Sequence, residues 1–190
     1  MSDTASDMRP ITPLGAYKPA SFSYGPVTIV ENIDTSLASF ALRLGHEKKG
    51  QQALKGFLGK AVPGVAKSLA GAPGAFWMGP EQWMVTAPLG SHEDLADQLA
   101  ATAKGAASVT EQTGGWCRFD LSGDGLADVF ERLCPADLRK MVPGDVTRTS
   151  IEHLGCFLLV TSAQDVTVYG PRSSAGSLYH ALQTAMRSAL

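Results

Sequence analysis

Two similar runs of secondary-structure pattern follow one another in residues 36–190, and they constrain the fold more than any other feature. Each run mixes stretches of alternating apolar and polar residues, typical of half-buried strands, with stretches whose apolar residues recur three and four apart, typical of helices. The first run predicts the order strand, helix, strand, strand, helix, strand, and the second predicts strand, helix, strand, strand, strand, helix. We therefore predict an α+β fold of two ferredoxin-like, split β-α-β halves with mainly antiparallel sheets, at about residues 36–113 and 114–190.

Turn-forming and capping residues predict where these elements begin and end. The pair Gly114-Gly115 lies between two strand patterns, at residues 108–112 and 116–122, and predicts a tight hairpin that joins them. Residues with side-chain acceptors precede the helical patterns and predict their N-terminal caps. These predicted caps are Ser91 with Asp94, Asp124, and Ser173 or Ser174.

Residues 1–26 predict an extended N-terminal arm ahead of a single domain at residues 27–190. Four prolines and two glycines exclude a helix in the arm and oppose a paired strand. The arm is nevertheless too apolar for a solvated tail, because it contains Tyr17, Phe22 and Tyr24. Two interpretations remain open: the arm lies over its own domain, or it packs on a partner subunit. In the second, these three side chains contact the partner and the domain folds without the arm.

Composition excludes several classes of protein. The 190-residue chain has a net charge of −2, so it has no basic excess that would attract nucleic acid or an anionic membrane. No apolar run approaches the roughly 18 residues of a membrane span. The polar first eight residues do not resemble a secretion signal, so we expect a cytoplasmic protein. The cysteines, Cys117, Cys134 and Cys156, show no metal-ligand spacing and are expected to be buried, unreactive thiols.

The sequence carries no recognisable catalytic, dinucleotide, phosphate or metal motif, so we predict no catalytic, cofactor-binding or metal-binding residue. Gly123-Asp124-Gly125 precedes a predicted helix, but the carboxylate of Asp124 would repel a phosphate there. Trp116 and Arg118 share one face of a predicted strand. They either pack against each other across the strand or form an exposed aromatic and arginine patch of the kind found at protein interfaces.

Several segments resemble a known family in their order and spacing. They are Trp77-Met-Gly-Pro-Glu-Gln-Trp-Met-Val85, Trp116-Cys-Arg-Phe-Asp-Leu-Ser-Gly-Asp-Gly-Leu-Ala-Asp-Val-Phe-Glu-Arg-Leu-Cys-Pro-Ala-Asp-Leu138, Pro143-Gly-Asp-Val-Thr-Arg-Thr149 and Val168-Tyr-Gly-Pro-Arg-Ser-Ser174. Together they resemble the gamma subunit of heterotetrameric sarcosine oxidase and, more distantly, the folate-binding fold of aminomethyltransferases. The resemblance covers residues 36–190 and adds little for the arm.

This resemblance implies a subunit with no flavin and no catalytic residue of its own. FAD, FMN, NAD and tetrahydrofolate are then expected on partner subunits, with the large alpha subunit as the main contact beside the beta and delta subunits. One departure concerns a short connector: where aminomethyltransferases and many gamma subunits have Asp-x-Ser, this chain has Glu111-Gln112-Thr113. We therefore assign no folate-binding or catalytic role to these positions.

The expected function is that of a non-catalytic gamma subunit. Its complex would demethylate sarcosine to glycine, pass the one-carbon unit to tetrahydrofolate and pass electrons to oxygen. Two alternatives remain open: a free-standing folate-binding or one-carbon-transfer protein of the same fold, and an assembly factor that binds a partner transiently. Neighbouring genes for large flavin-bearing chains would favour the subunit. The expected partner-interface residues are Tyr17, Phe22, Tyr24, Trp116 and Arg118.

Overall fold

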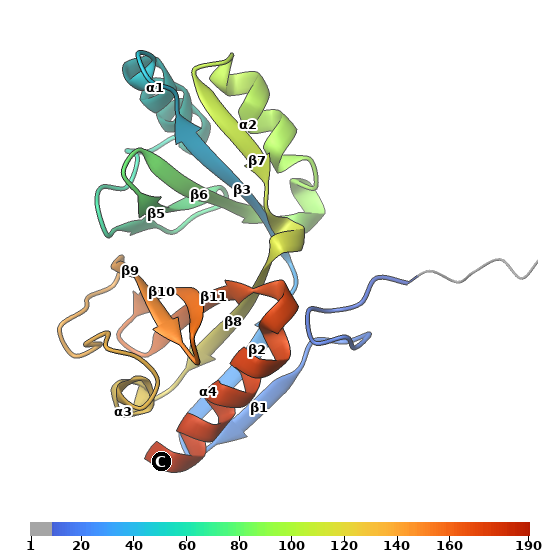
Figure 1. The fold of residues 1–190 in the computed structure, drawn as a ribbon, viewed down its shortest axis with the longest axis vertical. Helices are drawn as coiled ribbons and strands as arrows, with labels where there is room; N and C mark the ends of the chain where they lie inside the picture. Colours follow the sequence, from blue (N-terminus) through green and yellow to red (C-terminus); the bar gives the residue numbers. More distant parts are fainter. Residues whose placement is uncertain (1–8) are drawn as a thin grey trace, which may run out of the picture.

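The computed structural model describes residues 9–190, so the polar segment at residues 1–8 lies outside it. The described chain forms two β-sheets that face each other, and helices cover the outer side of each sheet (Figure 1). Every paired strand runs antiparallel to its neighbours. The predicted α+β class with two mainly antiparallel sheets is therefore confirmed.

The first half of the molecule is a five-stranded sheet with two helices. Its strands stand in the order β4-β5-β6-β3-β7, and α1 and α2 pack on the outer face. The bounds are β3 (Thr35–Leu42), α1 (Glu47–Leu58), β4 (Ser68–Leu69), β5 (Gly74–Gly79), β6 (Gln82–Pro88), α2 (Leu95–Ala103) and β7 (Ala107–Glu111).

The second half is a six-stranded sheet with two further helices. Its strands stand in the order β1-β2-β8-β11-β10-β9, so strands from both ends of the chain share one sheet. The bounds are β1 (Ser21–Tyr24), β2 (Val27–Asn32), β8 (Trp116–Ser122), α3 (Leu126–Glu131), β9 (Val146–Ile151), β10 (Leu154–Ser162), β11 (Asp165–Pro171) and α4 (Ala175–Ala189).

Strand β10 shows how the second sheet is buried on both faces. Alternate side chains of a strand point to opposite faces. Cys156, Leu158 and Val160 belong to the core beneath α3 and α4, whereas Phe157 and Leu159 belong to the core between the two sheets. A strand covered on both faces needs an unbroken apolar run, and these five consecutive residues supply it.

The prediction that residues 1–26 lack a paired strand is wrong for β1. Ser21 to Tyr24 pair with Val30 to Val27 as an edge hairpin on the second sheet. Pro19 and Pro26 flank this strand but do not interrupt it, so its own backbone N–H groups remain available for pairing. Tyr24 joins Val27 through a tight turn at Gly25, whose φ of 56° suits glycine.

The hairpin predicted at Gly114-Gly115 is also wrong. The two flanking strands do not pair, because β7 is the edge of the first sheet and β8 lies inside the second. The connection is instead a 3₁₀ turn, η2 (Thr113–Gly115), that carries the chain from one sheet to the other. Hydrogen bonds from Leu37 N to Thr113 Oγ1 (2.9 Å) and from Gln112 N to Leu37 O (2.8 Å) hold the end of β7 on β3.

The predicted helix caps do not bond through their side chains to the backbone N–H groups of the helices. Ser91 Oγ lies 2.9 Å from His92 Nδ1, and α2 begins later, after Asp94. Asp124 accepts a bond from Gln164 Nε2, and the glycine that follows it precedes α3. Ser174 does stand at the start of α4, again without a capping bond.

Two of the three cysteines are buried as predicted. Cys117 and Cys156 lie in the core beneath α3 and α4, and Cys134 is partly buried. All three are free thiols. Burial raises the pKa of Cys117 to about 12 and that of Cys156 to about 11, so both thiols stay protonated at neutral pH. Within residues 9–190, no helix is long and apolar enough to cross a membrane. No group of three potential metal-ligating side chains gathers in that part of the chain.

Candidate functional site

The chain crosses between the two sheets twice, and both crossings lie side by side. The first crossing, residues 33–34, links β2 to β3, and the second is η2. The strands that enter and leave them are neighbours in both sheets, because β2 pairs with β8 and β3 pairs with β7. Any opening between the sheets at this end is therefore walled by both connections.

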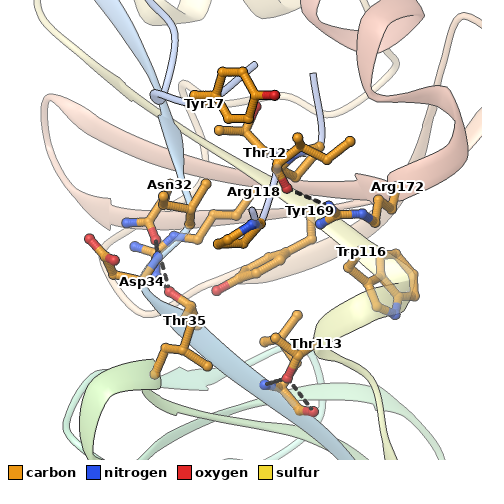
Figure 2. Close-up of a pocket in the computed structure, with 16 residues that line it drawn as sticks. Thr12, Tyr17, Asn32, Asp34, Thr35, Thr113, Trp116, Arg118, Tyr169 and Arg172 are labelled. Carbon is orange, nitrogen blue, oxygen red and sulfur yellow. Dashed lines mark hydrogen bonds between the residues drawn. The ribbon is translucent and has the colours of Figure 1, made fainter. Parts of the chain in front are cut away.

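A cavity of about 310 Å³ lies between the sheets at these crossings (Figure 2). Its walls come from the two crossings, the inner face of the second sheet and the N-terminal residues 10–17. This volume is within the range of small-molecule pockets. The lining residues are Pro10, Ile11, Thr12, Pro13, Tyr17, Asn32, Ile33, Asp34, Thr35, Leu37, Leu89, Thr113, Trp116, Arg118, Tyr169 and Arg172.

Asp120 organises the polar floor beside this cavity. Its Oδ1 accepts hydrogen bonds from Arg118 Nε (2.9 Å) and Thr167 Oγ1 (2.6 Å), and its Oδ2 accepts one from Asn32 Nδ2 (2.9 Å). Arg118 NH1 also donates to Thr35 Oγ1 (2.9 Å) at the start of β3. The network ties β8, β11, β2 and β3 together, and it neutralises the charge of Arg118 within the protein.

Tyr169 lies at the centre of the space between the sheets. Its ring stacks on Phe76 of the first half at 5.2 Å, and the guanidinium of Arg118 lies 5.8 Å from its centroid. Burial raises the pKa of Tyr169 to about 12, although the nearby Arg118 opposes this shift. The hydroxyl is therefore neutral near pH 7 and is a hydrogen-bonding group rather than a base.

A second cavity, of about 200 Å³, lies on the other side of this pair. Arg118 and Tyr169 line both cavities, so their side chains form the partition between them. The remaining walls of the second cavity include Ser68, Thr86 and Gly144. At that end the sheets are joined by backbone bonds from Ser68 N to Gly144 O (2.7 Å) and from Val146 N to Ala66 O (3.0 Å).

Glu31 fixes the N-terminal wall of the first cavity. This side chain is buried, and its two carboxylate oxygens accept hydrogen bonds from Leu14 N (2.9 Å) and Ala20 N (3.0 Å). Arg172 NH2 donates a further bond to Ile11 O (3.0 Å), drawn as a dashed line in Figure 2. Residues 11–20 are thus fastened to their own domain at both ends, as the first of the two interpretations of the arm predicted.

The five predicted interface residues do not share one surface. Tyr17, Trp116 and Arg118 line the first cavity, and Figure 2 places Tyr17 at its upper edge. Phe22 packs against the core beneath α3 and α4, and the guanidinium of Arg187 lies over its ring. Tyr24 lies on the edge strand β1 and is 41% exposed. The structure contains one chain, so it does not test contacts with a partner. The predicted contacts of these five residues stay predictions.

Trp116 and Arg118 pack on other aromatic rings rather than on each other. Trp116 lies 5.5 Å from Phe157, and its indole N–H donates to Gln112 Oε1 (3.1 Å), whereas Arg118 lies over Tyr169. The predicted packing of Trp116 on Arg118 is therefore wrong, whereas their predicted contact with a partner stays a prediction. Both side chains point inward because residues 116 and 118 alternate with the helix-facing residues of β8.

Sequence reasoning missed Tyr169 and Arg172 as site residues. Both lie in the segment Val168-Tyr-Gly-Pro-Arg172, which carries part of the family resemblance. That resemblance is the sequence feature that could have indicated them as site residues. Thr113 was set aside because of the Glu111-Gln112-Thr113 departure, yet it lines the cavity. Its hydroxyl is already bonded to Leu37, so its role is to hold the crossing in place.

The fold is similar to that of two solved structures. No protein-family model and no curated protein sequence matches the chain. A chain of the heterotetrameric sarcosine oxidase from Corynebacterium sp. U-96 matches 85% of this chain and 84% of its own length, with a TM-score of 0.76 and 24% identity. The glycine cleavage system aminomethyltransferase T from Bartonella henselae matches 80% of this chain, with a TM-score of 0.61 and 14% identity. This chain covers 44% of that aminomethyltransferase. The two-sheet architecture described above is therefore the fold that this chain shares with both proteins.

Proposed function

We propose that this protein is the gamma subunit of a heterotetrameric sarcosine oxidase and that it carries no catalytic residue. The observation that supports this most is a structural match over most of the length of both chains, at 85% and 84%. The segments that resemble the gamma subunit in sequence lie in both halves, and the matched chain belongs to a heterotetrameric sarcosine oxidase, so both observations support a subunit of such a complex. Under this proposal the complex oxidises sarcosine to glycine, and the flavins, NAD and tetrahydrofolate bind the alpha and beta subunits.

Co-expression tests this proposal. The chain is produced together with large flavin-bearing chains of a sarcosine oxidase from the same organism, and a tag is placed on this chain only. We expect flavin-bearing chains to co-purify with the tagged chain in stoichiometric amount. The purified complex should consume oxygen when sarcosine is added. The same tagged chain purified alone should be colourless, since it has no dinucleotide fingerprint. An active oxidase that assembles fully without this chain would contradict the proposal, as would a stoichiometric flavin in the chain alone.

A free-standing folate-binding protein is the second candidate, and the cavity is the observation that favours it. The sequence suggested no cluster of basic side chains, but the fold brings Arg118 and Arg172 to one cavity. Arg118 is already paired with Asp120, which leaves Arg172 for a ligand carboxylate. Under the subunit proposal we expect tetrahydrofolate to bind the isolated chain weakly or not at all. Calorimetric 1:1 binding at micromolar affinity, lost in Arg172→Gln, would favour this second candidate instead.

A further inference from the structure

Three exposed apolar side chains line the first cavity. Ile11 is 53% exposed, Tyr17 is 75% exposed and Ile33 is 36% exposed, and all three line the cavity. We call these three residues the apolar rim. They come from the N-terminal segment and the first crossing, so the rim belongs to two of the cavity walls. Exposed apolar residues that gather around a concavity mark a surface that binds something.

We propose that the apolar rim and the cavity together form the docking site for a segment of a partner subunit, one that carries an apolar side chain next to an Asp or Glu carboxylate. The apolar side chain enters the cavity, and the carboxylate pairs with Arg172. This inference rests on the proposed function, because it assumes that the chain belongs to a complex. It names the surface and the chemistry of the contact, which the proposed function leaves open.

The rim favours a polypeptide segment over a small molecule. A small molecule that fills about 310 Å³ would leave the outward surfaces of Ile11 and Tyr17 in water. A polypeptide segment covers the rim and fills the cavity at once, which is how buried anchors and a surrounding ring of contacts are arranged at protein interfaces.

The charges around the cavity set the chemistry of the partner. Arg118 is neutralised by Asp120, whereas no carboxylate within residues 9–190 forms an ion pair with Arg172. Among residues 9–190, the side chain of Arg172 donates a hydrogen bond to Ile11 O, which uses a single donor of a guanidinium that has five. Asp34 stands across the cavity from Arg172 (Figure 2), so an incoming carboxylate is attracted to the Arg172 side and repelled from the other.

The rim is already held in place before any partner binds. Glu31 binds Leu14 N and Ala20 N, and Arg172 binds Ile11 O, so the backbone that carries Ile11 and Tyr17 is fastened on both sides. A surface that is ordered in advance loses less conformational entropy on docking. Arg172 therefore has two roles: it positions the rim, and its remaining donors face the partner.

The test measures the affinity of variants of this chain for the large flavin-bearing chains in the full complex. Arg172→Glu reverses the charge, and we expect it to weaken binding by about a hundredfold, since a buried charge pair is replaced by a repulsion. Arg172→Gln keeps a donor for Ile11 O and should weaken binding by about tenfold. Tyr17→Ser should also cost about tenfold, because it removes the large aromatic side chain that the docked segment covers. Reversing the matching acidic residue of the large chain to Lys should restore the binding of Arg172→Glu.

Matched controls come from the far end of the first half. Arg43 is exposed and, like Arg172, donates one bond to a neutral acceptor, Ser108 Oγ (3.1 Å). Leu44 is 94% exposed. Arg43→Glu and Leu44→Ser should bind within about twofold of the wild type, since isolated exposed side chains contribute little. The thermal midpoint of each isolated variant is measured as well, and a loss of binding with an unchanged midpoint supports the docking site.

The outcomes separate this inference from the proposed function. If the wild-type complex forms and the Arg172 and Tyr17 variants bind as tightly as the controls, the docking site is wrong and the proposed function stands. If no complex forms with the wild-type chain, both are wrong. Native mass spectrometry of the isolated chain tests whether something else occupies the docking site. A dimer that is lost in Tyr17→Ser would overturn the proposal, and so would a bound small molecule that is lost in Arg172→Gln.

Discussion

Helix α4 of the second half buries six residues against a six-stranded sheet, whereas α1 of the first half buries three against a five-stranded one. The core beneath α3 and α4 contains 20 buried residues, and the core beneath α1 and α2 contains 12. Because stability rises with buried apolar area, the second half has the larger share of it. The first half depends more on the shared core between the sheets, where Leu37, Phe76 and Met84 meet Phe157 and Tyr169.

Removing the Phe76 side chain should uncouple the two halves and cause the largest loss of stability among the substitutions proposed in this section. Its ring lies 5.3 Å from that of Phe157 and 5.2 Å from that of Tyr169, so it joins the halves. We expect Phe76→Ala to lower the free energy of unfolding by about 3–5 kcal/mol, as for other buried aromatic truncations. Denaturant unfolding should then show two transitions, with the first half unfolding first. A single transition at an unchanged midpoint would contradict the comparison.

The titration of tyrosines and cysteines at alkaline pH should act on the second half. Every cysteine and every tyrosine of the chain lies outside residues 35–111. Tyr169 has a pKa of about 12 in the fold against an ordinary 10.0, so above pH 10 the unfolded chain releases this proton first. The free energy of unfolding is therefore unaffected below pH 10 by this group and falls by about 3 kcal/mol as pH rises to 12.

The thiols extend this effect to lower pH, because the pKa of Cys117 is raised from 9.0 to about 12. Urea titrations between pH 8 and 11.5 measure the change. In Phe76→Ala, only the second transition should move with pH. In Tyr169→Phe, the free energy of unfolding should fall less steeply above pH 10. Equal movement of both transitions would contradict the assignment.

Glu31→Ala tests whether the N-terminal segment belongs to the second half. The substitution leaves the amides of Leu14 and Ala20 without their acceptor, and we expect a loss of about 2 kcal/mol, within the range for unsatisfied buried groups. Hydrogen exchange at these two amides should accelerate in parallel. Glu31→Gln keeps one acceptor oxygen and should lose less. Unchanged exchange in Glu31→Ala would show that the segment is held by other contacts.

Gly56→Ala is expected to give the smallest effect, with the opposite sign. Gly56 lies in α1, where a Cβ would meet nothing within 4 Å. Alanine has the higher helix propensity and a less flexible unfolded chain, so the first half should gain about 1 kcal/mol. The gain should appear as a shift of the first transition in Phe76→Ala. Gly50→Ala is the matched control, since its Cβ would lie 2.4 Å from Leu42 Cδ2, and it should destabilise.

The sequence predicts best those elements whose partners are near in the chain. The hairpin of β5 and β6 and the strands β9 to β11 follow from local alternation and adjacent turns. Strand β2 also alternates, with Val27, Ile29 and Glu31 buried, but its partner β8 begins more than 80 residues later, so no local signal paired them. Gly114-Gly115 has the composition of a hairpin turn, and composition alone does not state whether the strands on either side share a sheet.

The candidate site could be predicted only in part, because it is assembled from distant segments. Trp116 and Arg118 stand out as an aromatic and arginine pair on one strand face. Arg172 reaches Ile11 across 161 positions of sequence, and no pattern within either segment indicates the other. The direction of Arg118 follows from strand alternation, but the side of the sheet that meets the first half is decided by tertiary packing.

The insertion of the first half between β2 and β8 has a consequence for synthesis on the ribosome. Residues 35–111 emerge as one continuous unit, and the core beneath α1 and α2 can form as soon as β7 leaves the exit tunnel, before Phe157 and Tyr169 of the shared core are translated. The hairpin of β1 and β2 has by then been outside the ribosome for roughly 4–16 seconds, at elongation rates of about 5–20 residues per second, with the apolar side chains of Val27 and Ile29 still uncovered. Strand β2 therefore waits for β8, which begins more than 80 residues later, and during that time the hairpin is open to binding by a chaperone.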